Sequence, residues 1–458
     1  MTLTTVILAA GKGKRMHSDL PKVLHHLAGK PLLEHVVRTT ASLDPKSQPI
    51  VVYGHQGERV KTSLDYLNVT WIHQTEQLGT GHAVQQTLTH LPADGRVLVL
   101  YGDVPLIKVE TLKHFIAETP ENAIGIITAE LPEPKGFGRI IRDNKNKIKA
   151  IVEEKDATDR QRAIHEINTG IYLIPADFLQ KHLPILKNEN AQQEFYLTDL
   201  IALAVKEKIN IHSVQPEHYE EILGVNDRLQ LACLERFYQE RFAEKLMLAG
   251  VTLLDPHRFD VRGEVQIASD VIIDINVVLE GHVKIGKGCV IGPNTLLRNV
   301  ILGDHVEIKA NSVLDGAEVG DHCTVGPFAR LRPGSILSPE IHVGNFVEIK
   351  NSLIGTATKI NHLSYIGDSE VGKHVIIGAG TITCNYNGAN KNKTTIGDDA
   401  FIGSNTALVA PVVIGDGATI GAGSTISRDA PAHRLTICRG QQRTIENWQR
   451  PIKKEKEK

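Results

Sequence analysis

A glycine-rich segment with basic side chains follows the first apolar run of the chain. Residues 6–10 are apolar, the sequence Gly-Lys-Gly-Lys-Arg comes directly after them and ends at Arg15, and Lys22 lies further on. Glycines after a strand let backbone N–H groups approach a phosphate, and cationic side chains balance its charge. A tight turn is the simpler alternative, since the spacing G-x-G-x-R differs from the dinucleotide-binding G-x-G-x-x-G. With Arg15 and Lys22 beside it, the segment predicts a phosphate-binding loop.

An aspartate ends the most apolar strand that the sequence predicts. Residues 96–103 read Arg-Val-Leu-Val-Leu-Tyr-Gly-Asp, which places Asp103 at the edge of the sheet where the strand ends. Ligands of open α/β sheets bind at this edge, and Mg²⁺ chelated to phosphates needs a hard oxygen ligand. The alternative is that Asp103 only caps the next helix. Because a phosphate-binding loop already implies a metal, we favour Asp103 as a Mg²⁺ ligand.

Two cations occupy equivalent places of a six-residue repeat in the second half of the chain. Arg332 and Lys350 each follow an aliphatic residue and are separated by three repeats. If three repeats make one coil, the chain returns to the same face about 4.8 Å along the axis, so the cations stack. Like charges repel unless an anion lies beside them, although a solvated charge ladder is the alternative. Further polar residues fall on the same face, and together they predict a pocket for a phosphorylated polar ligand: Tyr365, Asn385 and Tyr386.

A histidine begins a column of small side chains on the preceding face. His362 lies just beyond an aliphatic position, and Ala379, Ser404 and Ala422 take the matching position in later coils if residues 384–395 replace one repeat. An extended ligand with a reactive end, such as acetyl-CoA, fits a groove of this kind. Histidine titrates near neutral pH, so it can take a proton from an attacking amine. A surface or packed histidine is the alternative, and the nearby cations distinguish His362 from the other histidines.

The elements that position these residues differ between the two halves of the chain. From Val261 onward aliphatic residues recur every six positions, with slips of register, and many are followed by glycine. This period is typical of a parallel β-helix, in which three hexads form one triangular coil. The polar interruption at 384–395 predicts a binding element or a contact to a neighbouring copy. The segment from Ala430 leaves the repeat and ends in the charge run 451–458, for which we favour a disordered, solvated tail.

The first half alternates strand and helix patterns. This alternation predicts an α/β fold with a parallel sheet and helices on both faces. The predicted strands are 4–10, 50–53, 96–103, 123–130 and 169–174, and the predicted helices include 31–40 and 80–88. Apolar residues at helical spacing over 229–250 predict one long linker helix. We therefore expect a domain at 1–228, the linker helix at 229–250, and a domain with a tail at 251–458.

Composition excludes several classes of protein. Lys and Arg total 51 against 53 Asp and Glu, and this net charge of -2 argues against a nucleic-acid footprint or a polybasic membrane surface. The five cysteines form no CxxC pair, which predicts free thiols in a reducing compartment and no zinc site. Neither a signal peptide nor a membrane-spanning run is recognisable. We expect a cytoplasmic protein that binds small molecules, with no nucleic-acid or membrane partner.

Motifs across the first half resemble those of the sugar-1-phosphate nucleotidylyltransferases. They are LAAGKGKRM (8–16), QLGTGHA (77–83), YGDVPL (101–106), GFGRI (136–140), VEEKDA (152–157), EINTGIY (166–172) and GVNDRLQL (224–231). With the hexapeptide half appended, nearly the whole chain resembles the bacterial bifunctional N-acetylglucosamine-1-phosphate uridylyltransferases/glucosamine-1-phosphate acetyltransferases. The resemblance implies a Rossmann-like nucleotidylyltransferase domain, a left-handed β-helix, a homotrimer whose sites are completed by neighbouring subunits, and a role in peptidoglycan and lipopolysaccharide synthesis.

The resemblance also implies a reaction and a set of residues for the first half. The sugar 1-phosphate would attack the α-phosphorus of UTP in line, a reaction that needs positioning and charge neutralisation and no general base. By this resemblance, uracil and ribose would contact Leu8, Ala9, Ala10, Gly11, Gln74, Gly79 and Thr80. Arg15 and Lys22 would bind the triphosphate, and Asp103 and Asn226 would ligate Mg²⁺. The sugar phosphate would contact Tyr101, Gly102, Gly138, Glu153 and Asn168.

For the second half, the resemblance implies acetyl transfer from acetyl-CoA to glucosamine 1-phosphate. Its motifs are FARLRPG (328–334), VGNFVEIKNS (343–352), INHLSYIGD (360–368), GAGTITCNYNGANK (378–391), FIGSNTALVAP (401–411) and ICRG (437–440). His362 would be the general base. The amino sugar phosphate would contact Arg332, Lys350, Tyr365, Asn385 and Tyr386, and the coenzyme would contact Ala379, Ser404, Ala422 and Arg439. The family usually has Asn where this chain has Ile376, so one polar contact to the sugar is missing.

Two other functions remain open on the sequence alone. One is a nucleotidylyltransferase whose hexapeptide half only assembles or regulates, as in enzymes like ADP-glucose pyrophosphorylase. The stacked pair Arg332 and Lys350 and the histidine His362 argue against it, since a coil used only for assembly does not need them. The other is a non-catalytic scaffold, which the intact Gly11, Arg15, Lys22 and Asp103 argue against.

Overall fold

The computed structural model describes residues 2–46 and 48–451, which fall into two compact units, Met1–Phe242 and Ala243–Lys458. One long helix, α8 (Arg228–Leu248), crosses the boundary between them, where the sequence predicts a helix over 229–250. Within the described ranges, no helix combines the length and the apolar character that crossing a membrane requires. All five cysteines are free, as predicted.

A nine-stranded sheet forms the centre of the first unit. Its strands are β1 (Leu3–Ala9), β4 (Ile50–Tyr53), β5 (Thr70–His73), β6 (Arg96–Tyr101), β7 (Ile124–Glu130), β8 (Arg139–Arg142), β9 (Ile148–Val152), β10 (Glu166–Pro175) and β11 (Ile211–Val214). Their order is β11-β7-β10-β6-β1-β4-β5, with β8 paired to β10 and β9 paired to β8. The expectation of a parallel sheet is wrong at β10, which is antiparallel to both β6 and β7. Two parallel strands need a crossover connection, which is usually a helix. The hairpin β8–β9 precedes β10 instead, so no single crossover helix sets the direction of β10.

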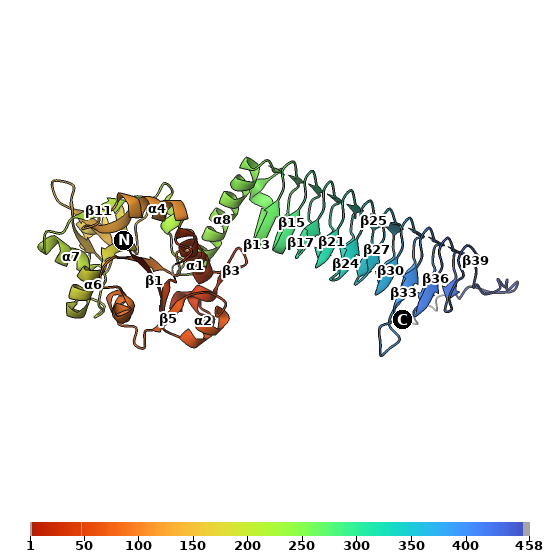
Figure 1. The fold of residues 1–458 in the computed structure, drawn as a ribbon, viewed down its shortest axis with the longest axis horizontal. Helices are drawn as coiled ribbons and strands as arrows, with labels where there is room; N and C mark the ends of the chain where they lie inside the picture. The colour runs from red at the N-terminus through yellow and green to blue at the C-terminus, as the bar shows by residue number, and fades with distance from the viewer. Residues whose placement is uncertain (1, 47, 452–458) are drawn as a thin grey trace, which may run out of the picture. The chain divides into compact units, whose positions relative to one another are not determined.

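Helices cover both faces of this sheet (Figure 1). They are α1 (Leu32–Leu43), α2 (Gly57–Ser63), α3 (Thr80–Gln85), α4 (Val109–Glu118), α5 (Asp159–Arg162), α6 (Ala176–His182) and α7 (Asp199–Lys206). Alternate residues of one strand enter different cores: Val6 packs with residues of α6 and α7, and Ile7 packs with residues of α1 and α4. Burial on both faces explains why these strands read as continuous apolar runs.

Short elements complete the two units. They are the hairpin of β2 (His26–Leu27) and β3 (Lys30–Pro31) and the 3₁₀ helices η1 (Lys14–Met16), η2 (Lys22–Leu24), η3 (Leu88–His90), η4 (Leu183–Ile185), η5 (Tyr219–Ile222) and η6 (Pro256–Arg258).

The first half of α8 packs on the first unit, where the carboxylate of Glu235 accepts a hydrogen bond from the backbone N–H of Ala28 at 2.8 Å. Arg241 of the same helix donates to the carbonyl oxygen of Leu106 at 3.1 Å.

The second unit is a parallel β-helix of stacked coils (Figure 1). One ladder contains β12 (Thr252–Leu253), β14 (Ile272–Ile273), β16 (Val290–Ile291), β19 (Glu307–Ile308), β22 (Thr324–Val325), β25 (His342–Asn345), β28 (Lys359–His362), β31 (Ile376–Ile377), β34 (Phe401–Ile402), β37 (Thr419–Ile420) and β39 (Leu435–Thr436). A second, seventeen-stranded sheet supplies the remaining sides of the coils. It contains β13 (Phe259–Ile267), β15 (Val277–Ile285), β17 (Leu296–Arg298), β18 (Ile301–Leu302), β20 (Val313–Asp315), β21 (Ala317–Val319), β23 (Arg330–Leu331), β24 (Ser335–Leu337), β26 (Glu348–Lys350), β27 (Leu353–Ile354), β29 (Tyr365–Gly367), β30 (Ser369–Val371), β32 (Ile382–Cys384), β33 (Thr394–Ile396), β35 (Ala407–Val409), β36 (Val412–Ile414) and β38 (Thr425–Ile426).

The aliphatic residues of the hexads face inward and pair from coil to coil, which confirms the predicted repeat. Ile360 pairs with Ile377 and Ile402 pairs with Ile420, each with its equivalent on the next coil, and all four side chains are buried. Ile377 also pairs with Ile402, although a longer stretch of chain separates them, because the extra residues project as a loop between β32 and β33 (Figure 1). The register assumed for the polar interruption is therefore correct.

The end of the β-helix lies further along the chain than the repeat predicts. The hexad pattern stops near Ala430, yet β39 still pairs with β37. A short strand can join the ladder through its backbone alone, so the aliphatic pattern does not reveal it. The predicted disordered tail lies mostly outside the described residues, since 452–458 are not described.

Replacing an inward-facing hexad residue should destabilise the second unit strongly. Ile308→Ala, at a side chain only 1% exposed, should lower the free energy of unfolding by about 2–5 kcal/mol, since it removes buried methyl groups and leaves a cavity. Ile301→Ala is the matched control, because that side chain is 48% exposed. Denaturant unfolding of the full chain measures both variants, and equal losses would contradict an inward-facing core.

Candidate active sites

The predicted phosphate-binding loop joins β1 to η1 and lies against Lys22. Gly13 has a left-handed backbone, with φ 58°, and a Cβ atom there would come within 2.8 Å of the Cβ atom of Lys22. Met16 is buried and its backbone N–H donates to the carbonyl oxygen of Gly13 at 2.9 Å, which closes the turn. Gly11 faces open space and Arg15 is exposed. The loop therefore offers backbone N–H groups and a guanidinium to a ligand beyond the end of β1.

Three side chains from distant segments converge beside this loop. The ammonium of Lys22 forms an ion pair with the carboxylate of Asp103 and lies 3.5 Å from the side-chain oxygen of Asn226. The backbone N–H of Val225 donates to the carbonyl oxygen of Asp103 at 2.9 Å, and this bond holds the segment that carries Asn226 next to Asp103. The structure thus brings to one cation both Asp103, which its place at the strand end suggests as a metal ligand, and Asn226, which the resemblance implies as one. Across the described ranges, no group of three or more His, Cys, Asp or Glu residues is arranged to hold a metal ion.

The residues expected to contact a sugar phosphate lie on β6 and β10 or directly next to the ends of β6, β8 and β9. A Cβ atom on Gly138 would lie 3.4 Å from the carboxylate of Glu153, and the carbonyl oxygen of Gly138 accepts from the N–H of Asn168 at 2.8 Å. Burial raises the pKa of the Glu153 carboxyl, although a hydrogen bond from Thr198 at 3.2 Å opposes this. Burial and the charge of Glu153 also raise the pKa of Tyr101.

The residues expected to hold the base follow β5. Gln74 is buried, and its amide nitrogen donates to the carbonyl oxygen of Gly79 at 3.2 Å, just before α3 begins at Thr80. The hydroxyl of Thr80 accepts from the backbone N–H of Leu197 at 3.1 Å. Of the remaining expected contacts, Leu8 and Ala9 end β1 and Ala10 follows it, while Gly102 follows the paired strand β6.

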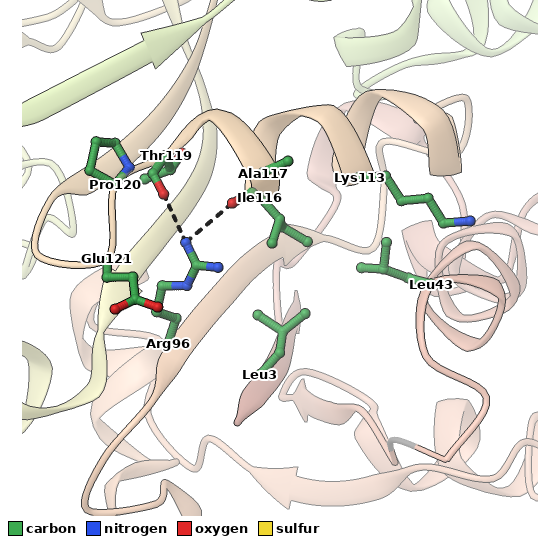
Figure 2. Close-up of a pocket in the computed structure, with 9 residues that line it drawn as sticks. All are labelled: Leu3, Leu43, Arg96, Lys113, Ile116, Ala117, Thr119, Pro120 and Glu121. Carbon is green, nitrogen blue, oxygen red and sulfur yellow. Dashed lines mark hydrogen bonds between the residues drawn. The ribbon is translucent and has the colours of Figure 1, made fainter. Parts of the chain in front are cut away.

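A different hollow, of about 500 Å³, lies at the other edge of the same sheet (Figure 2). It is lined by Leu3 and Arg96, the first residues of β1 and β6, and by the ends of α1 and α4. The guanidinium of Arg96 donates to the carbonyl oxygens of Ile116 and Thr119, at 3.2 and 3.0 Å, and caps the end of α4 (Figure 2). None of the residues singled out by the sequence lines this hollow, so we do not assign it to catalysis.

In the second unit, the predicted cation pair is stacked and is also paired with carboxylates. Leu331 pairs with Ile349, which places Arg332 and Lys350 at equivalent positions of adjacent coils. The guanidinium of Arg332 lies 2.9 Å from the carboxylate of Glu348, and the ammonium of Lys350 lies 3.1 Å from that of Asp368. The protein itself thus supplies part of the negative charge that the stacking argument assigns to a ligand.

Lys391, from the loop between β32 and β33, restores a positive excess at this place. The nearby ammonium of Lys350 lowers the pKa of Lys391. Burial alone would raise the pKa of Asp368, but hydrogen bonds from Asn351, Lys350 and Asn385 outweigh it and hold that pKa low. An open groove of about 890 Å³ is lined by three cations and two carboxylates: Lys350, Lys391, Lys393, Asp368 and Glu370. Such a groove favours an anionic ligand.

Sequence reasoning missed the carboxylate of Glu348 that pairs with Arg332, and it missed Asp368 and Lys391 of the groove. Gly367 is the residue that pairs with Lys350 on the next coil, and Asp368 follows it and reaches the Lys350 ammonium with its side chain. Of the residues that were predicted, Asn385 donates to the hydroxyl of Tyr365 at 3.3 Å, and Tyr386 is exposed on the loop.

The histidine column has the predicted register. Ile360, Ile377, Ile402 and Ile420 pair in succession, so His362, Ala379, Ser404 and Ala422 lie in one column just beyond them. A Cβ atom on Gly421 would lie 2.7 Å from the guanidinium of Arg439, which places that cation beside Ala422. His362, Ser404 and Ala422 are exposed and Ala379 is half-buried, so small side chains follow the ring along the surface of the β-helix.

Ile376 lies in the same ladder, between Lys359 and Phe401, and its side chain is 46% exposed. An apolar side chain thus occupies the surface position where the resemblance expects an amide.

Comparison with known families places a transferase signature on each unit. A model described as MobA-like NTP transferase domain matches residues 5–162, and one described as GMPPB C-terminal domain matches residues 261–350. A model described as Bacterial transferase hexapeptide (six repeats) matches residues 393–428. A solved nucleotidyl transferase from Methanothermobacter thermautotroptrophicus is 17% identical, with a TM-score of 0.38, and the match covers 52% of this chain and 97% of that one.

Two curated relatives match from end to end. Both are named Bifunctional protein GlmU and come from Acinetobacter baumannii strains AYE and ACICU; each is 54% identical over 456 residues, which is 100% of either chain. The chain belongs to the GlmU family. As a GlmU family member it is a bifunctional nucleotidylyltransferase and N-acetyltransferase, so neither an assembly-only second half nor a non-catalytic scaffold applies. It acetylates glucosamine 1-phosphate from acetyl-CoA and transfers a uridylyl group from UTP to the product, giving UDP-N-acetylglucosamine and pyrophosphate.

Removing the carboxylate of Asp368 should release the loop between β32 and β33. Asp368→Ala removes the hydrogen bonds from Asn385 and Lys350, so a lysine-specific protease should cut at Lys391 roughly fivefold faster or more. Asp315→Ala is the control, since that carboxylate pairs with Arg298 on other coils. Equal cleavage rates in the two variants would show that Asp368 does not anchor the loop.

Proposed function

We propose that the uridylyltransferase site lies in residues 1–228 and the acetyltransferase site in residues 251–458, with residues 229–250 as the linker helix. The observation that carries this division is that each unit has its own cluster of functional side chains. Lys22, Asp103 and Asn226 converge in the first unit, and the groove around Lys350 lies in the second.

In the first site, the loop holds the triphosphate of UTP while the sugar 1-phosphate attacks its α-phosphorus. Arg15 and Lys22 offset the charge that builds on the leaving pyrophosphate, and an exposed guanidinium beside open backbone suits this role. The attacking phosphate is already ionised, so no side chain need accept a proton. Uracil and ribose lie against Leu8, Ala9, Ala10, Gly11, Gln74, Gly79 and Thr80, and the sugar phosphate lies against Tyr101, Gly102, Gly138, Glu153 and Asn168.

Mg²⁺ fits the position that the Lys22 ammonium occupies between Asp103 and Asn226. A cation is already held there between a carboxylate and an amide oxygen, and hard oxygens are the ligands that Mg²⁺ prefers. Asp103 and Asn226 would hold the ion, which would supply positive charge to the phosphates.

In the second site, the amine nitrogen of glucosamine 1-phosphate attacks the thioester carbonyl carbon of acetyl-CoA. His362 accepts the proton that leaves the amine, the C–S bond breaks, and coenzyme A departs as the thiolate, which takes up a proton. The stacking of Arg332 on Lys350 and the three lysines that line the groove support phosphate binding there, with Tyr365, Asn385 and Tyr386 around the sugar. The column of small side chains supports a coenzyme along Ala379, Ser404 and Ala422, with Arg439 at its end.

We further propose a cytoplasmic homotrimer whose partners are small molecules, with no nucleic-acid or membrane partner. The near-neutral charge balance and the free cysteines support this, and hexapeptide β-helices suit threefold assembly. Neighbouring subunits would complete the second site.

His362→Ala should abolish acetyl transfer and spare uridylyl transfer. Loss of a general base should lower kcat for acetyl transfer by about 10²–10⁴-fold, and the first unit does not contain this residue. Parallel assays of both half-reactions on one preparation measure the effect. Loss of both activities would refute two independent sites.

Asp103→Asn should weaken the binding of Mg²⁺ that supports uridylyl transfer, without affecting acetyl transfer. Loss of one carboxylate should raise the Mg²⁺ concentration for half-maximal uridylyl transfer by about tenfold or more. Asp44→Asn is a suitable control, since that residue follows the end of α1 and is not among the residues assigned to the site. An unchanged Mg²⁺ titration in Asp103→Asn would remove Asp103 from the metal site.

A further inference from the structure

The imidazole of His362 is held by an asparagine of the preceding coil. The side-chain oxygen of Asn345 lies 3.0 Å from Nδ1 of His362. The two residues pair in register, Asn345 at the end of β25 and His362 at the end of β28. The asparagine is half-buried and the ring is exposed, so the amide is the better-fixed partner of the two.

This contact selects one tautomer of the ring. An amide oxygen can only accept a hydrogen bond, so Nδ1 must carry the proton, and the lone pair of the neutral ring then lies on Nε2. Among the residues that the structure describes, none forms a hydrogen bond with Nε2. The next residue of the column is Ala379, whose methyl group neither donates nor accepts. Nε2 is therefore free to accept a proton from a ligand in the groove.

The charged and titratable groups on the neighbouring strands do not replace Asn345 as the partner of the His362 ring. His342 and Lys359 lie at the other ends of β25 and β28 from Asn345 and His362, and β31 carries no titratable side chain. Tyr365 lies past the corner on β29 and accepts a hydrogen bond from Asn385. The hydroxyl of Ser364 donates to the backbone carbonyl oxygen of His362 and does not reach for the ring.

We infer that Asn345 is a positioning residue for acetyl transfer, which fixes His362 with Nε2 as the proton-accepting atom. The inference rests on the proposed role of His362 as general base. An amide holds the ring through its oxygen but adds no negative charge, so it orients the base without stabilising the imidazolium as a carboxylate would. The released proton then passes more readily from Nε2 to the departing thiolate or to water.

Two substitutions at this position separate orientation from charge. Asn345→Ala removes the acceptor, so kcat for acetyl transfer should fall roughly tenfold to a hundredfold, while KM for glucosamine 1-phosphate changes little. Asn345→Asp keeps an acceptor oxygen and adds a charge that favours the imidazolium. It should recover most of the rate at high pH and move the acidic limb of kcat/KM up by about one pH unit or more.

The controls use the full-length protein. His342→Ala, on the same strand, should leave acetyl transfer within twofold of wild type, and thermal unfolding should show that all variants are folded. Wild-type kcat in Asn345→Ala, or an unshifted acidic limb in Asn345→Asp, would overturn the inference while His362→Ala remained inactive. If instead His362→Ala kept its acetyl transfer, the proposed general base would fail first.

Discussion

Backbone pairing between successive coils is the constraint on which the second half of the molecule depends. Each coil can form its ladder only if its inward aliphatic side chains lie over those of the coil before it, as Ile360, Ile377, Ile402 and Ile420 do. Once this register is fixed, every outward position is fixed with it. Residues far apart in sequence, such as Arg332 and Lys350 or Asn345 and His362, become neighbours without any direct selection of their contact. The functional surface is thus a consequence of core packing.

In the first half of the chain, the ends of the sheet strands bring the functional residues together. The parallel strands β1 and β6 are buried on both faces and end at the same edge of the sheet, where the chain must turn after each of them. Lys22 and Asp103 meet at that edge, and Asn226 reaches it from the segment just before α8. The ion pair joins two of these loops and presents their polar groups together. A shift of any one segment would separate the oxygens from the phosphate-binding loop.

The sequence predicts those features that follow from periodicity. Period six gave the columns, so the stacking of Arg332 on Lys350 and the line from His362 to Ala422 could be worked out residue by residue, and apolar runs located the long strands of the first sheet. The direction of β10 could not be predicted, because the hairpin before it carries no helical pattern that would reveal a change of connection. The groups that neutralise the cations were also missed. Glu348 and Asp368 act through side-chain reach, and Lys391 arrives on a loop, where spacing carries no information.

The strand pairing of the β-helix does not depend on the loop between β32 and β33. Ile377 pairs with Ile402 across this insertion as regularly as Ile402 pairs with Ile420 across an uninterrupted coil. The surplus chain is looped out to one side, tethered by Asn385 and Lys393 to carboxylates of the wall. Its length and composition can therefore diverge among homologues while the prism remains unaltered. The residues that recognise the ligand can therefore change without a change in the β-helix. The loop is also a suitable position for exchanging recognition segments between such enzymes.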